Sequence, residues 1–398
     1  MRILLTHRYF WPDSTPYAII LKKIAKRLVE DGHNVTVLST QPGYNSIAPT
    51  QDQAKTEVID GYRIHRIKLL PSVSWFTKMN GINMFIYFIS VISFGLRNRD
   101  FDVVMNATSP PILAGVAGRI VSMFSKAKHY YHFMDIHPEI GRISGEFSNP
   151  LMFKLLQKVD SYVCSKADRI FVLSEDMKNT LVSRPNCRNI RVSVLQNFDL
   201  TDSKELTDSP PTQYRKPDNV FRVIFAGNIG RFQNLEAIVE AFLEADDKQI
   251  QLVLLGDGKL KKRLHDRVVD TKSNSVLFFP HQSVEDANKI IRNADMGLIS
   301  LTPGIYQYAY PTKLISYLSV GCPVIAAIEA GSSLAQFISE REIGLTITPE
   351  ELPAGIQQIK ALATDMGRIS IYSNNASVTY KEFFEEAPVL DKWSEYFS

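Results

Sequence analysis

The sequence has 398 residues, of which 45% are hydrophobic and 22% carry charge. This length and apolar content predict more than one domain, each with its own core, and they exclude a disordered chain. The net charge of +3 divides unevenly: residues 1–200 carry 25 Lys and Arg against 16 Asp and Glu (+9), whereas residues 201–398 carry 20 against 26 (−6). A basic half indicates nucleic acid or an anionic membrane as a partner, and without a helix-turn-helix, zinc-finger or RNP-type motif we expect no nucleic acid.

The cysteines Cys164, Cys187 and Cys322 lack CxxC or metal-like spacing, which is typical of packed, reduced thiols in a cytosolic protein. The first apolar run begins directly after Met1-Arg2, with no signal peptide before it. We therefore expect a cytoplasmic protein that attaches peripherally to the inner face of the plasma membrane.

The first half alternates short apolar runs with helical patterns, which is typical of a doubly wound α/β domain with a parallel sheet. The predicted strands are 3–6, 35–39, 103–106, 130–133, 170–173 and 192–195, and the predicted helices are 17–30, 112–124, 151–165 and 175–183. The run from Val58 to Ile64 predicts a hairpin at one edge of the sheet, turning at Asp60-Gly61.

A segment rich in Asp, Ser, Thr and Pro predicts an interdomain linker at 201–219, after which the alternation resumes. The predicted strands are 222–226, 251–255, 276–279, 296–300 and 324–327, and the predicted helices are 235–245, 260–269, 284–293 and 313–320. We thus expect Rossmann-like domains at 1–200 and 220–378, facing each other across a cleft, and a helix at 379–398 that packs back on the first domain. Ligands of such sheets bind beyond the carboxyl ends of the strands.

Glycine turns follow the first two strands of the second domain, at Gly227-Asn228-Ile229-Gly230-Arg231 and at Gly256-Asp257-Gly258. Glycine lets the backbone approach a ligand closely, and Arg231 can bind a phosphate through two N–H groups. Neither turn completes a P-loop or a dinucleotide fingerprint, and each is also typical of an ordinary tight βα turn.

The stretch from Leu301 to Ala326 predicts a short helix that begins at Pro311-Thr312-Lys313 and ends at Gly321. A basic residue in the first turn opposes the helix dipole, so Lys313 costs helix stability unless it helps to hold an anion such as a phosphate. The alternative is an ordinary crossover helix that happens to carry a lysine. Together with the glycine turns, Lys313 predicts one diphosphate-sized site.

A strand of the first domain ends in Tyr131-His132-Phe133-Met134-Asp135-Ile136-His137-Pro138-Glu139, with two histidines and two carboxylates. Acid/base or hydroxyl-binding roles, a metal site, and helix capping with core packing are the alternatives for these side chains.

The most apolar run extends from Met79 to Leu96, between Lys78 and the pair Arg97 and Arg99. It is too short and too interrupted to span a bilayer. It predicts either an interfacial helix on an anionic membrane, in contact through Lys78–Arg99, or a buried crossover helix.

Several segments in chain order resemble the GT-B-fold glycosyltransferases of family 4, in particular the bacterial polysaccharide-assembly transferases for N-acetylfucosamine or colanic-acid sugars. The resemblance covers nearly the whole chain. The matching segments are Tyr9-Phe10-Trp11-Pro12, Thr108-Ser109-Pro110-Pro111, Asp135-Ile136-His137-Pro138-Glu139, Ala167-Asp168-Arg169-Ile170, Gln196-Asn197-Phe198-Asp199, Gly227-Asn228-Ile229-Gly230 and Pro311-Thr312-Lys313 through Pro323-Val324-Ile325.

The resemblance implies that the second domain holds a nucleotide-sugar donor, that the first holds the acceptor, and that neither a metal nor a cofactor is needed. The implied donor-binding residues are Asn197, Gly227, Asn228, Gly230, Arg231, Gln233, Gly256, Gly258, Tyr308, Thr312, Lys313 and Ser316. The implied catalytic residues are Asp135, His132 and Glu139, and the implied acceptor-binding residues are Asp13, Ser14, Thr15 and His137.

The sequence also departs from the family pattern. The glycine pair of the first loop is absent, and the family's Arg and Lys in the diphosphate loop fall on Asn228 and Gln233. The family's two Glu residues fall on Tyr308 and Ser316, and the second of these normally binds the ribose hydroxyls.

We therefore expect a retaining glycosyltransferase that moves a sugar from a UDP or GDP donor to a lipid-linked or saccharide acceptor in surface polysaccharide assembly, alongside other assembly enzymes. A non-catalytic nucleotide-sugar or carbohydrate-binding subunit of such a complex, and a GT-B epimerase acting on UDP-sugars, are the alternatives.

Overall fold

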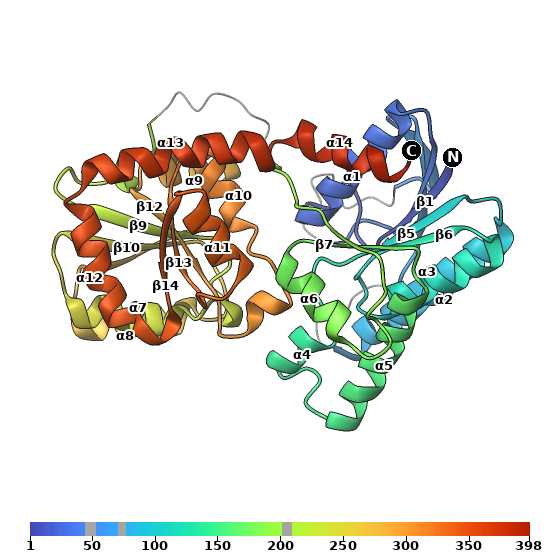
Figure 1. Ribbon diagram of the computed structural model, residues 1–398, viewed down its shortest axis with the longest axis horizontal. Coiled ribbons are helices and arrows are strands. Elements are labelled where there is room, and N and C mark those ends of the chain that lie inside the picture. Colours follow the sequence, from blue (N-terminus) through green and yellow to red (C-terminus); the bar gives the residue numbers. More distant parts are fainter. Residues whose placement is uncertain (44–52, 71–76, 201–208) are drawn as a thin grey trace. The chain divides into compact units, whose positions relative to one another are not determined.

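A computed structural model of the chain describes residues 1–43, 53–70, 77–200 and 209–398, with side chains omitted for 77–80. The chain forms two compact units (Figure 1). The first unit comprises Met1–Leu200, Tyr308–Tyr310 and Glu386–Ser398, and the second comprises Thr201–Gln307 and Pro311–Glu385. The first unit is thus built from three separate stretches of sequence, and the last boundary lies after Glu385 rather than after residue 378. Part of the expected linker, residues 201–208, lies outside the described residues.

The sheet of the first unit has the strand order β3-β4-β2-β1-β5-β6-β7-β8, and every neighbouring pair is parallel except β3 with β4. Its strands are β1 (Arg2–Thr6), β2 (Asn34–Thr40), β3 (Thr56–Ile59), β4 (Tyr62–Ile67), β5 (Val103–Ala107), β6 (Lys128–His132), β7 (Arg169–Val172) and β8 (Val192–Val194). The central strands are buried on both faces, which explains their continuous apolar runs. The edge hairpin turns at Asp60 (φ 48°) and Gly61 (φ 85°), as the sequence predicts.

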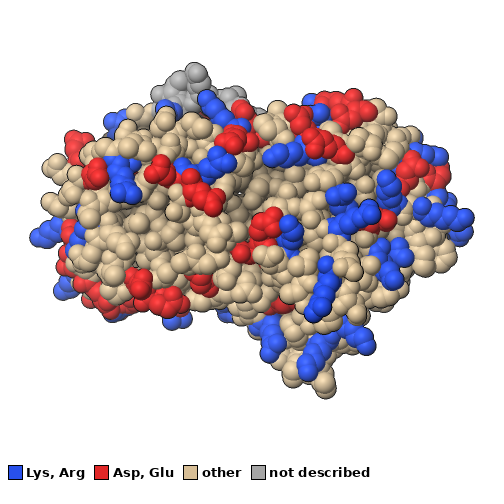
Figure 2. All heavy atoms as spheres, viewed as in Figure 1, with Lys and Arg blue, Asp and Glu red and all other residues tan. Residues whose placement is uncertain are grey.

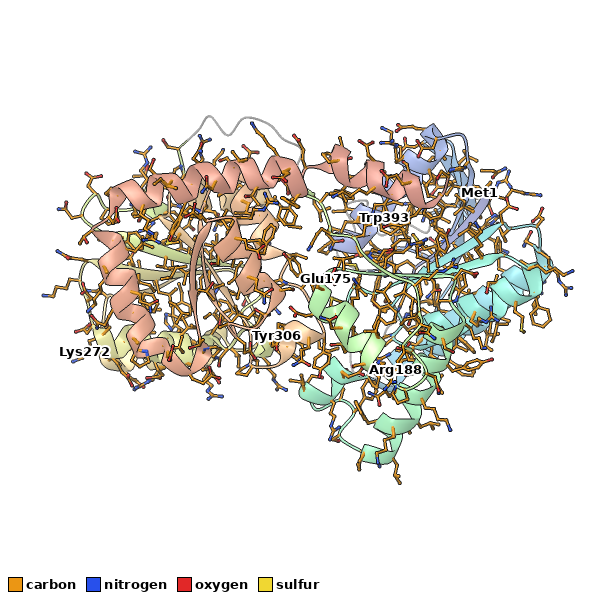
Figure 3. The ribbon with its side chains drawn as sticks, viewed as in Figure 1. Met1, Glu175, Arg188, Lys272, Tyr306 and Trp393 are labelled. Atoms are coloured by element: carbon orange, nitrogen blue, oxygen red, sulfur yellow. The ribbon has the colours of Figure 1, made fainter. Side chains whose placement is uncertain are left out.

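Helices cover both faces of this sheet, with α1 and α14 on one face and α2, α3 and α5 on the other (Figure 1). The helices are α1 (Pro16–Glu30), α2 (Thr77–Arg97), α3 (Leu113–Ser125), α4 (Glu139–Ile143), α5 (Pro150–Lys166), α6 (Glu175–Ser183) and α14 (Glu386–Tyr396). Trp393 of α14 (Figure 3) and Phe397, just after the helix, lie in the same buried cluster as residues of α1, β1 and β2. Helix α14 is also held to α1 by two ion pairs, Lys23 with Glu386 (2.6 Å) and Arg27 with Asp391 (2.7 Å).

Helix α2 combines features of both expectations for the apolar run. Its residues Asn83, Tyr87 and Val91 are buried. Its residues Ile82, Phe85 and Ile89 remain 48%, 57% and 47% exposed. One side of α2 therefore packs on the unit, chiefly against α3, as expected of a crossover helix. The other side is an apolar strip that is exposed to solvent.

The sheet of the second unit is entirely parallel, with the order β11-β10-β9-β12-β13-β14. Its strands are β9 (Phe221–Ala226), β10 (Ile250–Leu255), β11 (Val276–Phe279), β12 (Met296–Ser300), β13 (Val324–Ala327) and β14 (Gly344–Ile347). The helices are α7 (Leu235–Ala245), α8 (Lys261–Thr271), α9 (Val284–Arg292), α10 (Lys313–Ser319), α11 (Ser333–Glu340), α12 (Leu352–Ala363) and α13 (Met366–Phe383).

Helices α7 and α8 lie on one face of the second sheet, and α9, α10 and α13 lie on the other (Figure 1). The order of the sheet reverses between β9 and β12, because the chain builds outward from β9 through β10 to β11 and then returns to β12 on the opposite side. A reversal of this kind is where open α/β sheets bind ligands.

Candidate functional site

Three glycines form the floor of the candidate site, at the carboxyl ends of β9 and β10. Gly227, Gly256 and Gly258 have φ values of 126°, 141° and 157°, which side-chain-bearing residues rarely adopt. A Cβ atom on Gly256 would lie 2.2 Å from the carbonyl oxygen of Gly227, and one on Gly258 would lie 2.3 Å from that of Ile229. The two turns therefore pack backbone against backbone, and this close packing requires glycine.

Lys313 lies directly over this floor. A Cβ atom on Gly227 would be 3.1 Å from its Cε and 3.4 Å from its Nζ, and the Nζ stands 4.7 Å from the centre of the Phe225 ring. Burial lowers the pKa of Lys313 to about 8. Within the described part of the chain Lys313 has no ion-pair partner, so it offers a poorly solvated positive charge to an anion.

Helix α10 is anchored so that Lys313 keeps this position. The hydroxyl of Tyr317 accepts a hydrogen bond from the N–H of Ala226 (2.9 Å) and donates one to the carbonyl oxygen of Leu298 (3.1 Å). The helix has only seven residues, so the cation itself, more than the helix dipole, is the feature that favours an anion. Thr312, the N-cap of this helix, and Ser316 within it are both exposed.

The turn after β9 uses several of the predicted donor-binding residues for its own structure. The side chain of Gln233 accepts a hydrogen bond from the N–H of Gly230 (3.2 Å), and the amide of Asn228 lies against Gly230. The guanidinium of Arg231 is exposed, while its carbonyl oxygen accepts a hydrogen bond from the Thr302 hydroxyl (3.0 Å). Arg231 is thus the member of this turn that is available to a ligand as a cation.

In the first unit, the loop after β6 is paired with residues from far along the chain. Asp135 forms an isolated antiparallel bridge with Ala309, and the N–H of Ile136 donates a 2.8 Å hydrogen bond to the carbonyl oxygen of Tyr308. Burial raises the pKa of Asp135 to about 6, and no cation among the described residues forms an ion pair with it. A carboxyl group with this pKa can accept a proton near neutral pH.

Glu139 is held in a buried ion-pair network. Arg184 binds both oxygens of its carboxylate, at 3.0 and 2.5 Å, and Gln157 donates to it at 2.8 Å. The same guanidinium reaches Asp160 at 2.6 Å and the carbonyl oxygen of His137 at 2.8 Å. Glu139 therefore supports the loop that carries Asp135, which corresponds to the core-packing alternative.

His132 lies in the core beside helix α14. Its ring is 5.1 Å from that of Trp393, and its Nδ1 shares a 2.9 Å hydrogen bond with the hydroxyl of Tyr17. Burial lowers its pKa to about 3, so the imidazole is neutral at physiological pH. His137 is partly buried, and burial also lowers its pKa.

The predicted acceptor-binding residues lie in the loop between β1 and α1. The carboxylate of Asp13 is buried and accepts a hydrogen bond from the N–H of Gly43 (2.9 Å). The hydroxyl of Thr15 caps α1 through the N–H of Ala18 (3.3 Å), and Ser14 is partly exposed. Asn197, predicted as donor-binding, is buried in the first unit after β8, and its Nδ2 lacks a hydrogen-bond partner among the described residues.

Family models match both units of the chain. The model of "Glycosyltransferase Family 4" matches residues 18–198, and the model of "Glycosyl transferases group 1" matches residues 220–365. The chain belongs to glycosyltransferase family 4.

Two curated relatives and one solved structure resemble this family 4 glycosyltransferase. It is 23% identical over 272 residues to the probable glycosyltransferase WbjE of Pseudomonas aeruginosa, covering 66% of either chain. It is 23% identical over 261 residues to the putative colanic acid biosynthesis glycosyl transferase WcaI of Escherichia coli strain K12, covering 63% of this chain and 64% of that one. The alignments thus span about two thirds of these relatives.

The solved structure is that of Alr3699/HepE from Anabaena in complex with UDP. The two structures match with a TM-score of 0.70 at 15% sequence identity, over 100% of this chain and 99% of that one. The fold of this family 4 glycosyltransferase is therefore GT-B, as its sequence predicts.

The two positions where the family carries Glu fall in different units of this family 4 glycosyltransferase. Ser316 is exposed in the second unit, whereas Tyr308 is part of the first, where it packs with Tyr310 against a buried cluster that includes Ile136. The resemblance implies that both residues bind the donor. The loop instead divides its residues between the units.

Sequence reasoning missed Lys261 and Arg184. Lys261 reaches the carbonyl oxygen of Gly256 (2.8 Å), and its signal was a basic helix start directly after a glycine turn. Arg184 had no signal, because its partners Glu139 and Asp160 are distant in sequence. In the described ranges, no cluster of three or more His, Cys, Asp or Glu side chains could hold a metal ion. No described helix is long and apolar enough to cross a bilayer.

Proposed function

We propose that the chain is a retaining, metal-independent glycosyltransferase that moves a sugar from a UDP or GDP donor to a lipid-linked or saccharide acceptor during surface polysaccharide assembly. The observation that carries this proposal is Lys313, which is poorly solvated, forms no ion pair with any described residue and lies over the glycine turns of Gly227 and Gly256. Family membership supports glycosyl transfer, the UDP bound by HepE supports a nucleotide donor, and the similarity to WcaI, a putative colanic acid biosynthesis glycosyl transferase, supports polysaccharide assembly.

In the proposed reaction, the bond between the sugar's anomeric carbon and the oxygen of the donor diphosphate breaks. The nucleoside diphosphate leaves with the bonding electrons, and the acceptor hydroxyl oxygen bonds to the anomeric carbon from the same face. Negative charge grows on the leaving diphosphate, so fixed cations at Lys313 and Arg231 lower the barrier. The proton of the acceptor hydroxyl passes to the leaving phosphate oxygen.

Asp135 is the carboxylate that we assign to the sugar or acceptor side. Its pKa of about 6 is raised but still below neutral pH, so the carboxyl group is mostly ionised there. The carboxylate can accept hydrogen bonds from sugar hydroxyls and offset positive charge at the anomeric carbon. His132 and Glu139 are left out of this role because Tyr17 and Arg184 already bind them.

A membrane-facing role for α2 belongs to the same proposal. The exposed strip of Ile82, Phe85 and Ile89 suits the boundary between headgroups and acyl chains, with Arg97 and Arg99 exposed at its end. Helix α5 adds exposed Leu151, Leu155 and Tyr162, with Lys154 and Lys158 beside them. Figure 2 shows Lys and Arg side chains gathered over the region of α4 and α5. The side chain of Lys78 lies outside the described residues.

Calorimetry with UDP, GDP and dTDP tests the donor site directly. We expect one diphosphate to bind, and Lys313→Met to weaken it at least tenfold, whereas Lys262→Met, which removes an exposed lysine, leaves the affinity unchanged. Failure of all three to bind, or equal effects of the two substitutions, would exclude the proposed donor site.

A non-catalytic binding subunit is the second candidate, and Ser316 favours it, because this exposed hydroxyl stands where the family carries a ribose-binding carboxylate. Purified protein is incubated with each UDP- and GDP-sugar and a membrane extract as acceptor. Sugar transfer that depends on Asp135 and Lys313 rules out the subunit, and donor binding without transfer supports it.

A further inference from the structure

Lys261, the first residue of α8, lies at the glycine turns beside the proposed donor site. Its Nζ donates a 2.8 Å hydrogen bond to the carbonyl oxygen of Gly256. Gly256 is packed on Gly227, the residue that Lys313 covers. The N–H of Leu260, which precedes Lys261, bonds to the carbonyl oxygen of Ile229 at 3.1 Å. The start of α8 is therefore tied to both turns.

The first turn of α8 has an unfavourable charge for a helix start. Leu260 at the N-cap makes no side-chain cap, and the first turn contains no acidic residue. It carries Lys261, Lys262 and Arg263 instead, and positive charge there opposes the helix dipole. Arg263 is compensated by an ion pair with Glu236 (3.0 Å), whereas the partner of Lys261 among the described residues is a neutral carbonyl.

Two lysines therefore flank the same pair of glycines. Lys313 comes from α10 on one face of the second sheet, and Lys261 comes from α8 on the other (Figure 1). An ammonium group has three N–H donors, so Lys261 keeps two after bonding to Gly256. In the turn after β9, Asn228 and Gln233 are neutral and lie against Gly230, so Arg231 supplies the positive charge of that turn.

We propose that Lys261 is a further cation of the donor site, besides Lys313 and Arg231, and binds the donor diphosphate together with Lys313. The proposal rests on the proposed function, and it specifies the ligand as a nucleoside diphosphate rather than a monophosphate, because two separated cations match two phosphate groups.

Lys261→Gln tests this assignment, with Lys262→Gln as the matched control one residue away on the exposed side. Calorimetry measures binding of UDP, GDP and dTDP, each alongside its monophosphate. We expect Lys261→Gln to weaken diphosphate binding about tenfold and monophosphate binding less than about twofold, because one charged hydrogen bond to the second phosphate is lost. Lys261→Arg keeps the charge and restores most of the affinity, and Lys262→Gln changes neither.

Other outcomes overturn the assignment. Equal weakening of diphosphate and monophosphate, with a lowered urea midpoint of the unliganded variant, means that Lys261 only holds the Gly256 turn. If Lys261→Gln binds the nucleoside diphosphate as tightly as the wild type does, the Lys261 side chain does not contact the ligand. If the wild type binds no nucleoside diphosphate, the proposed function itself fails, and this result is distinct from a wild type that binds while Lys261→Gln binds equally well.

Discussion

The N–H of Ile136 donates a 2.8 Å hydrogen bond to the carbonyl oxygen of Tyr308, and Asp135 beside it bridges to Ala309. The segment 308–310 belongs to the first unit, although residues on either side of it belong to the second. The position of the Asp135 carboxyl group therefore depends on a loop from the far part of the chain as well as on β6.

Asp135→Asn is expected to stabilise the protein while removing its activity. The folded-state pKa of about 6 is above the ordinary value of 3.8, so ionising this carboxyl group costs folding free energy at higher pH. At pH 7.5 the Asn variant should gain up to about 3 kcal/mol in the free energy of unfolding. The gain should shrink as the pH falls through about 6 and vanish below about 4, where the carboxyl is protonated in both states.

Urea denaturation at pH 7.5 and pH 4 measures this difference, with sugar transfer assayed on the same samples. Asp257→Asn, at an exposed carboxylate of the Gly256 turn, is the matched control for stability. A pH-independent gain, or an unstabilised variant, would contradict the burial of Asp135.

Nucleoside diphosphate affinity is expected to fall as the pH rises through about 8. Burial lowers the pKa of Lys313 below its usual 10.5, so above about pH 8 the unliganded site loses the positive charge that attracts the anion. Calorimetry between pH 6.5 and pH 9.5 measures the change. Lys313→Arg should bind with little pH dependence in this range, because guanidinium keeps its proton. If the affinity of Lys313→Arg falls similarly over this pH range, a group other than Lys313 is responsible for the pH dependence.

Arg184→Met is expected to destabilise the protein by about 3–5 kcal/mol, because it leaves the carboxylates of Glu139 and Asp160 buried without their cation. Urea denaturation measures the loss, and Arg188→Met, at an exposed position nearby in the sequence, should change it by less than about 0.5 kcal/mol (Figure 3). Equal effects of the two substitutions would show that the ion-pair network is not needed for stability.

Charging the exposed strip of α2 is expected to release the protein from anionic vesicles. Phe85→Asp with Ile89→Asp places two carboxylates where apolar side chains would enter the bilayer interface. Sedimentation with phosphatidylserine-containing liposomes measures the bound fraction. Val269→Asp with Val284→Asp, at exposed positions of the second unit, is the control and should bind like the wild type. Unchanged sedimentation of the α2 variant would remove α2 from the membrane contact.

The parallel strands could be predicted from the sequence because buried parallel strands are continuous apolar runs between glycine turns. The GT-B fold was implied by the resemblance of the motif segments to family 4. Strand β14 (Gly344–Ile347) was missed because it has four residues, three of them only partly buried, at the sheet edge. The position of Lys313 at a helix start could be predicted as well, from Pro311 before the helix and Gly321 after it.

Contacts between distant segments could not be predicted in the same way. His132 and Glu139 were grouped with Asp135 as catalytic residues, but His132 packs against Trp393 and Glu139 pairs with Arg184, both distant in sequence. The placement of Tyr308 in the first unit likewise depends on pairing with the Asp135 loop, and no local pattern encodes that pairing.

The discontinuous first unit has a consequence for the order of folding during synthesis. Trp393 and Phe397 complete a core whose other members are mostly translated before residue 200. At about 5–20 residues per second, the ribosome delivers α14 roughly 10–40 s after it has made Leu200. Through that interval the nascent chain exposes the apolar patch that α14 later covers. We therefore expect the second unit to complete its core first, and the N-terminal portion to be the part on which chaperones act.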